Sequence, residues 1–181
     1  KANRHEFHDI QQMAIDYDVP FRFDAAIFGT FAGDKTPIEY RVDPEDAVTL
    51  EMADEKLTEG WKEYCLRIQA GSAPDTLYQC GAGVTNFHID PFGNLHPCIM
   101  PTGVSYNVLQ PGGFRHGWHN VLPELRKIRP SGDILECGRC DKRFVCTYCP
   151  AFFALETGSE TRRSSYLCAQ AHARHKTLFP D

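Results

Sequence analysis

Cysteine spacing constrains this chain more than any other feature of its sequence. Seven of its eight cysteines form one pattern, with two early members, a dense run and one late member: Cys80, Cys98, Cys137, Cys140, Cys146, Cys149 and Cys168. The run contains two C-x-x-C pairs separated by five residues, so four thiols lie on one short loop, closer together than core packing requires. The spacing therefore predicts metal binding, and it favours iron–sulfur clusters.

The rest of the composition excludes several kinds of partner. The 181 residues have a formal net charge of -5, which gives no sign of a surface that binds nucleic acid. No stretch approaches the roughly 18 consecutive apolar residues of a membrane span. The opening residues lead into an amphipathic segment and not into the apolar core of a signal peptide. We therefore expect no nucleic-acid partner, no membrane partner and a cytoplasmic location.

A cytoplasmic location also bears on the oxidation state of the cysteines. Thiols in a reducing compartment persist as metal ligands or reactive groups, whereas disulfide frameworks dominate short secreted chains with a higher cysteine density. Metal ligation is thus favoured over four disulfides. Cys65, the eighth cysteine, stands beside Leu66 on a predicted amphipathic helix, so we interpret it as a small buried apolar residue, with a ligand role in reserve.

The residues before the patterned cysteines predict two short regions. Apolar residues at helical spacing after Asn3 indicate a helix that ends before Pro20. Apolar and charged residues alternate at the start of residues 21–28, which indicates a strand. Residues 1–41 are therefore predicted to form one αβ unit. Such a unit cannot bury both of its faces alone and is typical of the end of a larger domain. Residues 42–79 form a helical linker, with helices over about 44–53 and 58–68.

Residues 80–181 form the cysteine-rich region. Strands before and after a turn at Gly93-Asn94 predict a β-hairpin, with Cys98 just beyond its second strand. A short helix over 118–128, interrupted at Pro123, and a helix over 151–157 that ends at Gly158 follow. The predicted fold class is therefore α+β.

Spacing also divides the patterned cysteines into two sets. The first three members of the dense run can reach one metal centre, while Cys149-Pro150 resembles the ferredoxin pattern in which the last cysteine turns to a different cluster. Cys168 can complete the first group, because the chain can double back after Gly158. The two resulting sets are Cys137, Cys140, Cys146 and Cys168, and Cys80, Cys98 and Cys149.

The region from about Cys80 to Cys168 resembles the SPASM domain found at the C-terminus of radical SAM enzymes. Twelve residues separate Cys80 from Gly93, and residues 87–98 look like the hairpin of that family. The resemblance implies a small domain with a β-hairpin and short helices around two metal clusters. In radical SAM enzymes a partial (β/α)6 barrel precedes the SPASM domain, and the αβ unit over 1–41 is similar to the end of that barrel. By this resemblance the chain corresponds to a truncated enzyme.

This resemblance implies two auxiliary [4Fe-4S] clusters. The first is held by Cys80, Cys98 and Cys149, and the second by Cys137, Cys140, Cys146 and Cys168. In that family the dense run often ends in C-x3-C. This sequence departs from the pattern, because only two residues separate Cys146 from Cys149. The first cluster has three thiolates, so we expect an open or substrate-filled fourth position, with Cys65 or a histidine as alternatives.

The resemblance also implies a function for the full-length enzyme. The chain lacks the C-x3-C-x2-C loop that holds the cluster by which radical SAM enzymes cleave S-adenosylmethionine, so this chain alone is not expected to cleave it, and its catalytic residues are unknown. A longer protein would bind S-adenosylmethionine and modify a peptide or protein substrate. The auxiliary clusters would bind substrate or transfer electrons, with a flavodoxin or ferredoxin as electron donor.

Two other classes of protein remain open. A structural zinc module would use the same thiolates in four-cysteine sites to recognise a partner, since such sites accept either metal. An independent ferredoxin-like carrier would need the clusters but no barrel, and the αβ unit over residues 1–41 argues against it.

Overall fold

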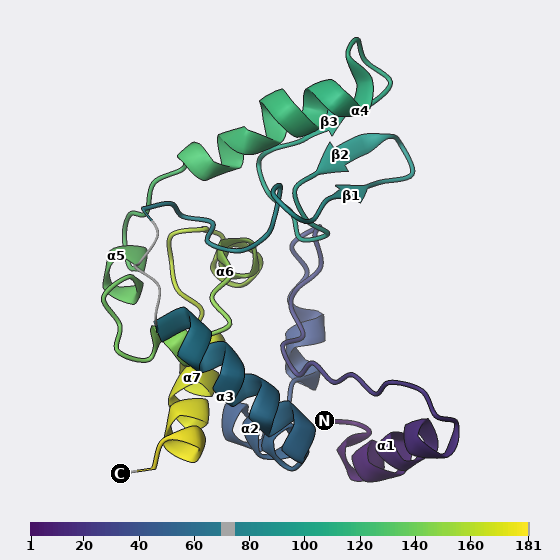
Figure 1. Ribbon diagram of the computed structural model, residues 1–181, viewed down its shortest axis with the longest axis vertical. Helices are drawn as coiled ribbons and strands as arrows, with labels where there is room; N and C mark the ends of the chain where they lie inside the picture. The colour runs from purple at the N-terminus through teal and green to yellow at the C-terminus, as the bar shows by residue number, and fades with distance from the viewer. Residues whose placement is uncertain (70–74, 181) are drawn as a thin grey trace. The chain divides into compact units, whose positions relative to one another are not determined.

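The computed structural model describes residues 1–69 and 75–180, and the chain forms two compact units (Figure 1). Unit 1 consists of residues 1–70, 141–147 and 165–181, and unit 2 consists of residues 71–140 and 148–164. Both units are therefore assembled from segments that lie far apart in the sequence. The division into 1–41, 42–79 and 80–181 stays a prediction.

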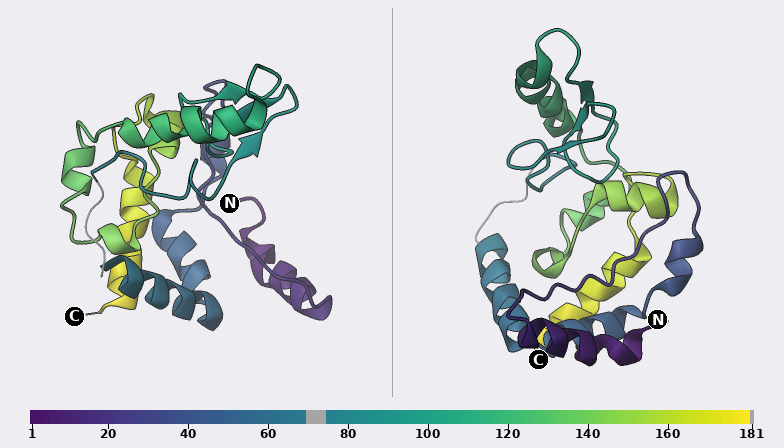
Figure 2. Two further views of the ribbon diagram at one scale, coloured as in Figure 1. Left: turned by 45° about the horizontal axis from the view of Figure 1, so that its top comes forward. Right: turned by 90° about the vertical axis from the view of Figure 1, so that its right-hand side faces the viewer.

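Unit 1 is helical in the residues that the structure describes. Its helices are α1 (Phe7–Asp16), α2 (Pro44–Met52), α3 (Glu55–Gln69) and α7 (Ser165–Leu178), with 3₁₀ turns at Arg4–Glu6, Thr36–Tyr40 and Arg143–Val145. The predicted helices before Pro20 and around 44–53 and 58–68 are thus confirmed as α1, α2 and α3. Helix α2 packs along α7 (Figures 1 and 2). No helix in the described part of the chain is long and apolar enough to cross a membrane.

The predicted strand over residues 21–28 is wrong. This stretch has no regular secondary structure, and the described part of unit 1 contains no strand beside it. A strand without a neighbour leaves its backbone N–H and C=O groups unpaired, so alternation alone does not make one. Phe21 and Phe23 instead pack edge-on against Phe7, at ring-centre distances of 5.5 and 4.9 Å. The alternating apolar residues therefore serve contacts with α1.

A buried ion pair joins three helices of unit 1. Arg174 on α7 donates from Nε to Glu51 Oε2 on α2 at 2.8 Å, and its guanidinium lies 4.5 Å from the ring centre of Trp61 on α3. The Trp61 indole N–H donates to the other oxygen of Glu51 at 2.7 Å. The side chain of Arg174 is 5% exposed, so its charge depends on Glu51 for compensation.

Over its described residues, unit 2 contains one small antiparallel sheet and several short helices. The sheet has the order β1 (His88–Ile89), β2 (Asn94–His96) and β3 (Tyr106–Asn107). A helical run follows, with α4 (Gly113–His116), a π-helical turn (Gly117–Val121) and a 3₁₀ helix (Leu122–Lys127); α5 (Ile134–Cys137) and α6 (Pro150–Thr157) complete the unit. The predicted hairpin is confirmed as β1 and β2, and the predicted end at Gly158 is confirmed for α6, while β3 was not predicted.

The sheet of unit 2 packs against the helical run that begins with α4 (Figure 1). Gly117 is the point of closest approach, because a Cβ there would lie 2.8 Å from Leu95 Cδ2 and 2.9 Å from Tyr106 Cδ1. Leu95, Leu122 and Leu125 are fully buried. The helix predicted over 118–128 is interrupted near Pro123, as expected, where the π-helical turn gives way to the 3₁₀ helix.

Replacement of Glu51 by alanine should destabilise unit 1 by about 3 kcal/mol, because it leaves the Arg174 guanidinium buried without its partner. Urea unfolding followed by circular dichroism measures the loss. Glu59→Ala is the control, since Glu59 pairs with Lys62 at 2.8 Å on the surface and its loss should cost at most about 0.5 kcal/mol. Equal costs for the two variants would contradict the role of the buried pair.

Candidate metal centre

Cys149 interacts electrostatically with the other two predicted ligands of the first set. It is the N-cap residue of α6, and burial raises the pKa of its thiol. The backbone N–H of Phe152 opposes that rise, whereas the nearby charges of Cys80 and Cys98 raise the pKa further. Cys80 and Cys98 therefore each lie within electrostatic range of Cys149 inside unit 2. Their role as ligands stays a prediction.

Cys80 lies in a segment, residues 78–82, that forms no helix or strand; we call it the Cys80 segment. One arginine side chain donates hydrogen bonds to three of its backbone carbonyls. Arg126 on the 3₁₀ helix donates to the carbonyl oxygens of Tyr78, Cys80 and Ala82, the last at 2.5 Å. Tyr78 and Ala82 are buried, whereas Cys80 between them is exposed. The backbone around Cys80 is thus fixed by hydrogen bonds and its thiol remains accessible.

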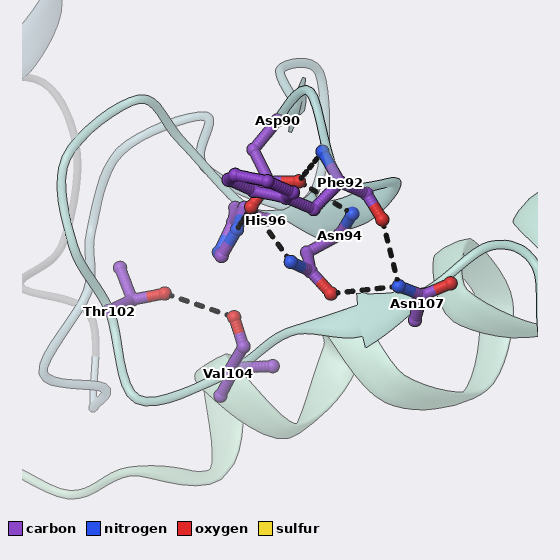
Figure 3. A network of polar contacts seen from close by, with 7 residues as sticks. All are labelled: Asp90, Phe92, Asn94, His96, Thr102, Val104 and Asn107. Carbon is purple, nitrogen blue, oxygen red and sulfur yellow. Dashed lines mark hydrogen bonds and ion pairs between the residues drawn. The ribbon is translucent and has the colours of Figure 1, made fainter.

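Cys98 follows a hairpin whose loop is held by local hydrogen bonds (Figure 3). The Gly93 N–H donates to the Asp90 carbonyl and the Asp90 N–H to the Asn94 carbonyl, each at 3.0 Å, with Gly93 at φ 83°. This is the common three-residue hairpin loop, in which a type I turn is followed by one residue in the left-handed conformation. Glycine adopts that conformation most readily. The loop therefore sets the direction of β2, which leads to Cys98.

The Asp90 carboxylate is the centre of the same loop. It accepts the side-chain amide of Asn94 at 2.8 Å and the backbone N–H groups of Asn94 and Phe92, each at 2.9 Å, and it lies 3.5 Å from His96 Nε2 (Figure 3). These hydrogen bonds lower the pKa of Asp90 from 3.8 to about 2, and the bond from the Asn94 side chain has the largest effect. The loop is thus stabilised by an ionised carboxylate.

One glycine connects the Cys80 segment to the hairpin. The Gly83 N–H donates to the carbonyl oxygens of Pro97 and Asn86, at 3.0 Å in each case. Pro97 is fully buried and directly precedes Cys98. A displacement of the Cys80 segment therefore also moves the backbone beside Cys98.

The residues next to α6 are joined to the Cys80 segment by two tyrosines. Tyr78 donates its hydroxyl to Glu160 Oε1 at 2.6 Å, and Tyr148 donates to the carbonyl of Leu77 at 3.0 Å. Burial raises the pKa of Tyr78 well above its usual range, and Glu160 adds to the shift. Tyr78 therefore remains a neutral donor at physiological pH, and these bonds place Cys80 relative to Cys149.

The second predicted set is divided between the two units. Cys137 and Cys140 belong to unit 2, where the Cys140 N–H donates to the Cys137 carbonyl at 3.2 Å. Cys146 and Cys168 belong to unit 1. This set stays a prediction. Cys65 is 0% exposed in a core cluster against which Cys146 packs, which agrees with its interpretation as a buried apolar residue.

The donor chemistry of the first set suits a metal cluster. Cys80, Cys98 and Cys149 are free thiols, and thiolates are soft ligands that zinc and iron–sulfur clusters both accept. Over the described ranges, no group of three or more histidines, cysteines and acids is placed to hold a metal ion. A single zinc would need its thiolates about 4 Å apart, because its bonds of about 2.3 Å meet at one ion. In a four-iron cluster each thiolate binds a different iron, so the thiolates stand farther apart.

A separate open cleft of about 880 Å³ lies within unit 1, between the start of α2 and one face of α7. Its lining includes Asp43, Glu45 and Asp46 from the segment that begins α2, and His172 and His175 from α7. None of the predicted ligand cysteines lines this cleft, so the two histidines are separate from the first set of thiols.

The sequence analysis missed the polar groups that support the first set. The hydrogen bonds of these groups, Arg126, Tyr78 and Glu160, join residues that lie 44 to 82 positions apart in the sequence. Neither helical periodicity nor strand alternation reports such contacts, because both patterns describe only local neighbours.

The chain is similar to known maturases over part of its length. It is 32% identical over 102 residues to mycofactocin maturase MftC of Mycobacterium tuberculosis, in strains CDC 1551 / Oshkosh and ATCC 25618 / H37Rv. The match covers 54% of this chain but only about a quarter of the length of these curated relatives. No family model matches the sequence, and no solved structure matches it.

This distant similarity relates part of the chain to a mycofactocin maturase. It leaves the finer assignment untested. The α+β SPASM-like fold, the two clusters and the barrel origin of the N-terminal unit therefore stay predictions.

The Asp90 loop should lose its hydrogen bonds in acid. Because folding lowers the pKa of Asp90, its stabilising effect is present above the ordinary pKa of 3.8 and disappears as the pH falls through about 2. An NMR titration should therefore show the Asp90 carboxyl protonating at about pH 2, together with a change in the Phe92 and Asn94 amide signals. In Asp90→Asn those amide signals should not titrate in this range. An ordinary midpoint for Asp90 would contradict the network.

Proposed function

We propose that this chain holds auxiliary iron–sulfur clusters for a radical SAM enzyme that modifies a peptide or protein. The observation that carries the proposal is the spacing of the seven patterned cysteines, and the influence of Cys80 and Cys98 on the pKa of Cys149 within unit 2 agrees with it. The distant similarity to a maturase supports it. Because the C-x3-C-x2-C motif is absent from these residues, cleavage of S-adenosylmethionine is assigned to the rest of a full-length enzyme.

Two sets of thiolates would hold two [4Fe-4S] clusters under this proposal. Cys80, Cys98 and Cys149 would hold the first, and the second would be held by Cys137, Cys140, Cys146 and Cys168. A bound cluster supplies a site that accepts or donates one electron, at a potential set by exposure and by hydrogen bonds to its sulfurs. The backbone N–H groups of Phe152 and Ala151 lower the pKa of Cys149 and so favour its thiolate form. They would be hydrogen-bond donors to the Cys149 sulfur of a bound cluster.

The first set has three thiolates, which leaves room for another ligand. We assign that position to a substrate atom or to an open iron. A substrate in this position would be held next to a redox centre, which suits a peptide undergoing oxidation or cross-linking. A flavodoxin or ferredoxin in the cytoplasm would supply electrons to the full-length enzyme.

Replacement of Cys98 by alanine should remove about four of about eight iron atoms per chain after anaerobic reconstitution, because it removes one of the three thiolates of the first set. Iron, acid-labile sulfide and zinc are measured together with the optical spectrum. Cys65→Ala is the matched control, since this buried cysteine belongs to the core of unit 1 and its loss should leave iron unchanged.

Two outcomes would reject the proposal. One or two zinc ions without sulfide in the wild-type chain would make it a structural zinc module. Equal iron contents in Cys98→Ala and the wild-type chain would remove Cys98 from the ligand set.

A further inference from the structure

Three carbonyl oxygens of the Cys80 segment converge on one guanidinium. They belong to Tyr78, Cys80 and Ala82, which are alternate residues, and all accept hydrogen bonds from Arg126. The Nη2 atom serves Cys80 and Ala82, while Nη1 serves Tyr78. The backbone on both sides of a predicted ligand is therefore oriented by a single side chain.

The position of Arg126 is itself fixed by the core of unit 2. Leu122 and Leu125 on the same 3₁₀ helix are 1% and 0% exposed. Their burial anchors the helix, so the guanidinium approaches the Cys80 segment from a rigid support. Cys80 has no comparable anchor of its own, because its side chain is exposed.

Only arginine matches this arrangement of acceptors. Its guanidinium presents five N–H donors in a planar fork, so it can serve several carbonyl oxygens in different directions. A lysine carries the same charge but concentrates its donors at one nitrogen. The contacts thus depend on the shape of the guanidinium as well as on its charge.

We propose that Arg126 is a positioning residue that preforms the Cys80 part of the first ligand set, by orienting three alternate carbonyls of residues 78–82 before any metal binds. The metal-binding part of this inference rests on the proposed function. The inference about the metal-free chain rests on the hydrogen bonds alone. Arg126 acts on the metal through Cys80 and does not touch it.

Hydrogen exchange on the metal-free chain tests this inference directly. The N–H groups of Val84, Thr85 and Asn86 donate to the Gly81 carbonyl at 2.9 to 3.1 Å, and that of Gly83 to Pro97, so their exchange reports on the order of the segment. In Arg126→Lys these amides should exchange at least about tenfold faster than in the wild-type chain. The Asp90 and Gly93 amides, which belong to the hairpin loop, should keep their rates.

Arg129→Lys is the matched control. Arg129 lies three residues away and bonds the Asp75 carbonyl and carboxylate, outside the Cys80 segment. Its replacement should leave exchange at residues 83–86 unchanged. The inference is overturned if Arg126→Lys leaves these amides protected, or if it accelerates exchange equally in the hairpin loop, which would indicate a general effect on folding.

Iron retention provides a second readout. After anaerobic reconstitution, a chelator should remove iron from Arg126→Lys at least about tenfold faster than from Arg129→Lys, because a disordered Cys80 releases its metal more often. Equal rates would overturn the metal-binding part of the inference. If the wild-type chain binds no iron, the proposed function fails, and the exchange experiment still decides the role of Arg126 in the metal-free chain.

Discussion

The backbone of residues 77–83 enters the core of unit 2 with no helix or strand to pair its polar groups. Buried N–H and C=O groups that lack partners are strongly unfavourable, so each must find one elsewhere. The Leu77 N–H donates to the Ile128 carbonyl, and its own carbonyl accepts the Tyr148 hydroxyl. Arg126 accounts for the carbonyls of Tyr78, Cys80 and Ala82, and the carbonyl of Pro97 accepts the Gly83 N–H. These requirements connect the segment to the hairpin, to the helical run and to the residues next to α6.

Each thiol of the first set is positioned by a different local structure. Cys98 follows a hairpin whose loop is fixed by Asp90, and Cys149 caps a helix, so neither needs metal to define its backbone. Cys80 depends on a charged side chain from another part of the unit. A preformed ligand set loses less conformational entropy on binding than one that must fold around its metal.

Local sequence signals predicted the elements that local physics determines. The Asp43-Pro44 start of α2, the Gly158 end of α6 and the turn at Gly93 each depend on the conformational preference of one or two residues. The same reasoning failed for residues 21–28, because a strand also requires a neighbour, which sequence alternation does not supply. Strand β3 was missed because its two residues show no alternation and, unlike those of β1, are not joined to β2 by a short turn.

For the candidate site, the sequence predicts a set of cysteines but not the side chains around them. Spacing groups Cys80, Cys98 and Cys149 because chemistry restricts how thiols share a metal, and their role as ligands stays a prediction. Arg126 has no such signature, since one arginine in the pattern L-P-E-L-R-K resembles any surface cation of a short helix. Its role depends on three carbonyl oxygens more than forty residues away, and backbone carbonyls are present at every residue.

The surroundings of Cys149 also have an energetic consequence. Burial raises the pKa of Cys149, and the neighbouring thiols raise it further, so the metal-free chain holds Cys149 as a neutral thiol near neutral pH. A metal ligand must lose that proton, and the positive charge of the metal compensates both the desolvation and the repulsion among thiolates. If the proposed set binds metal, binding would therefore release protons and would strengthen as the pH rises.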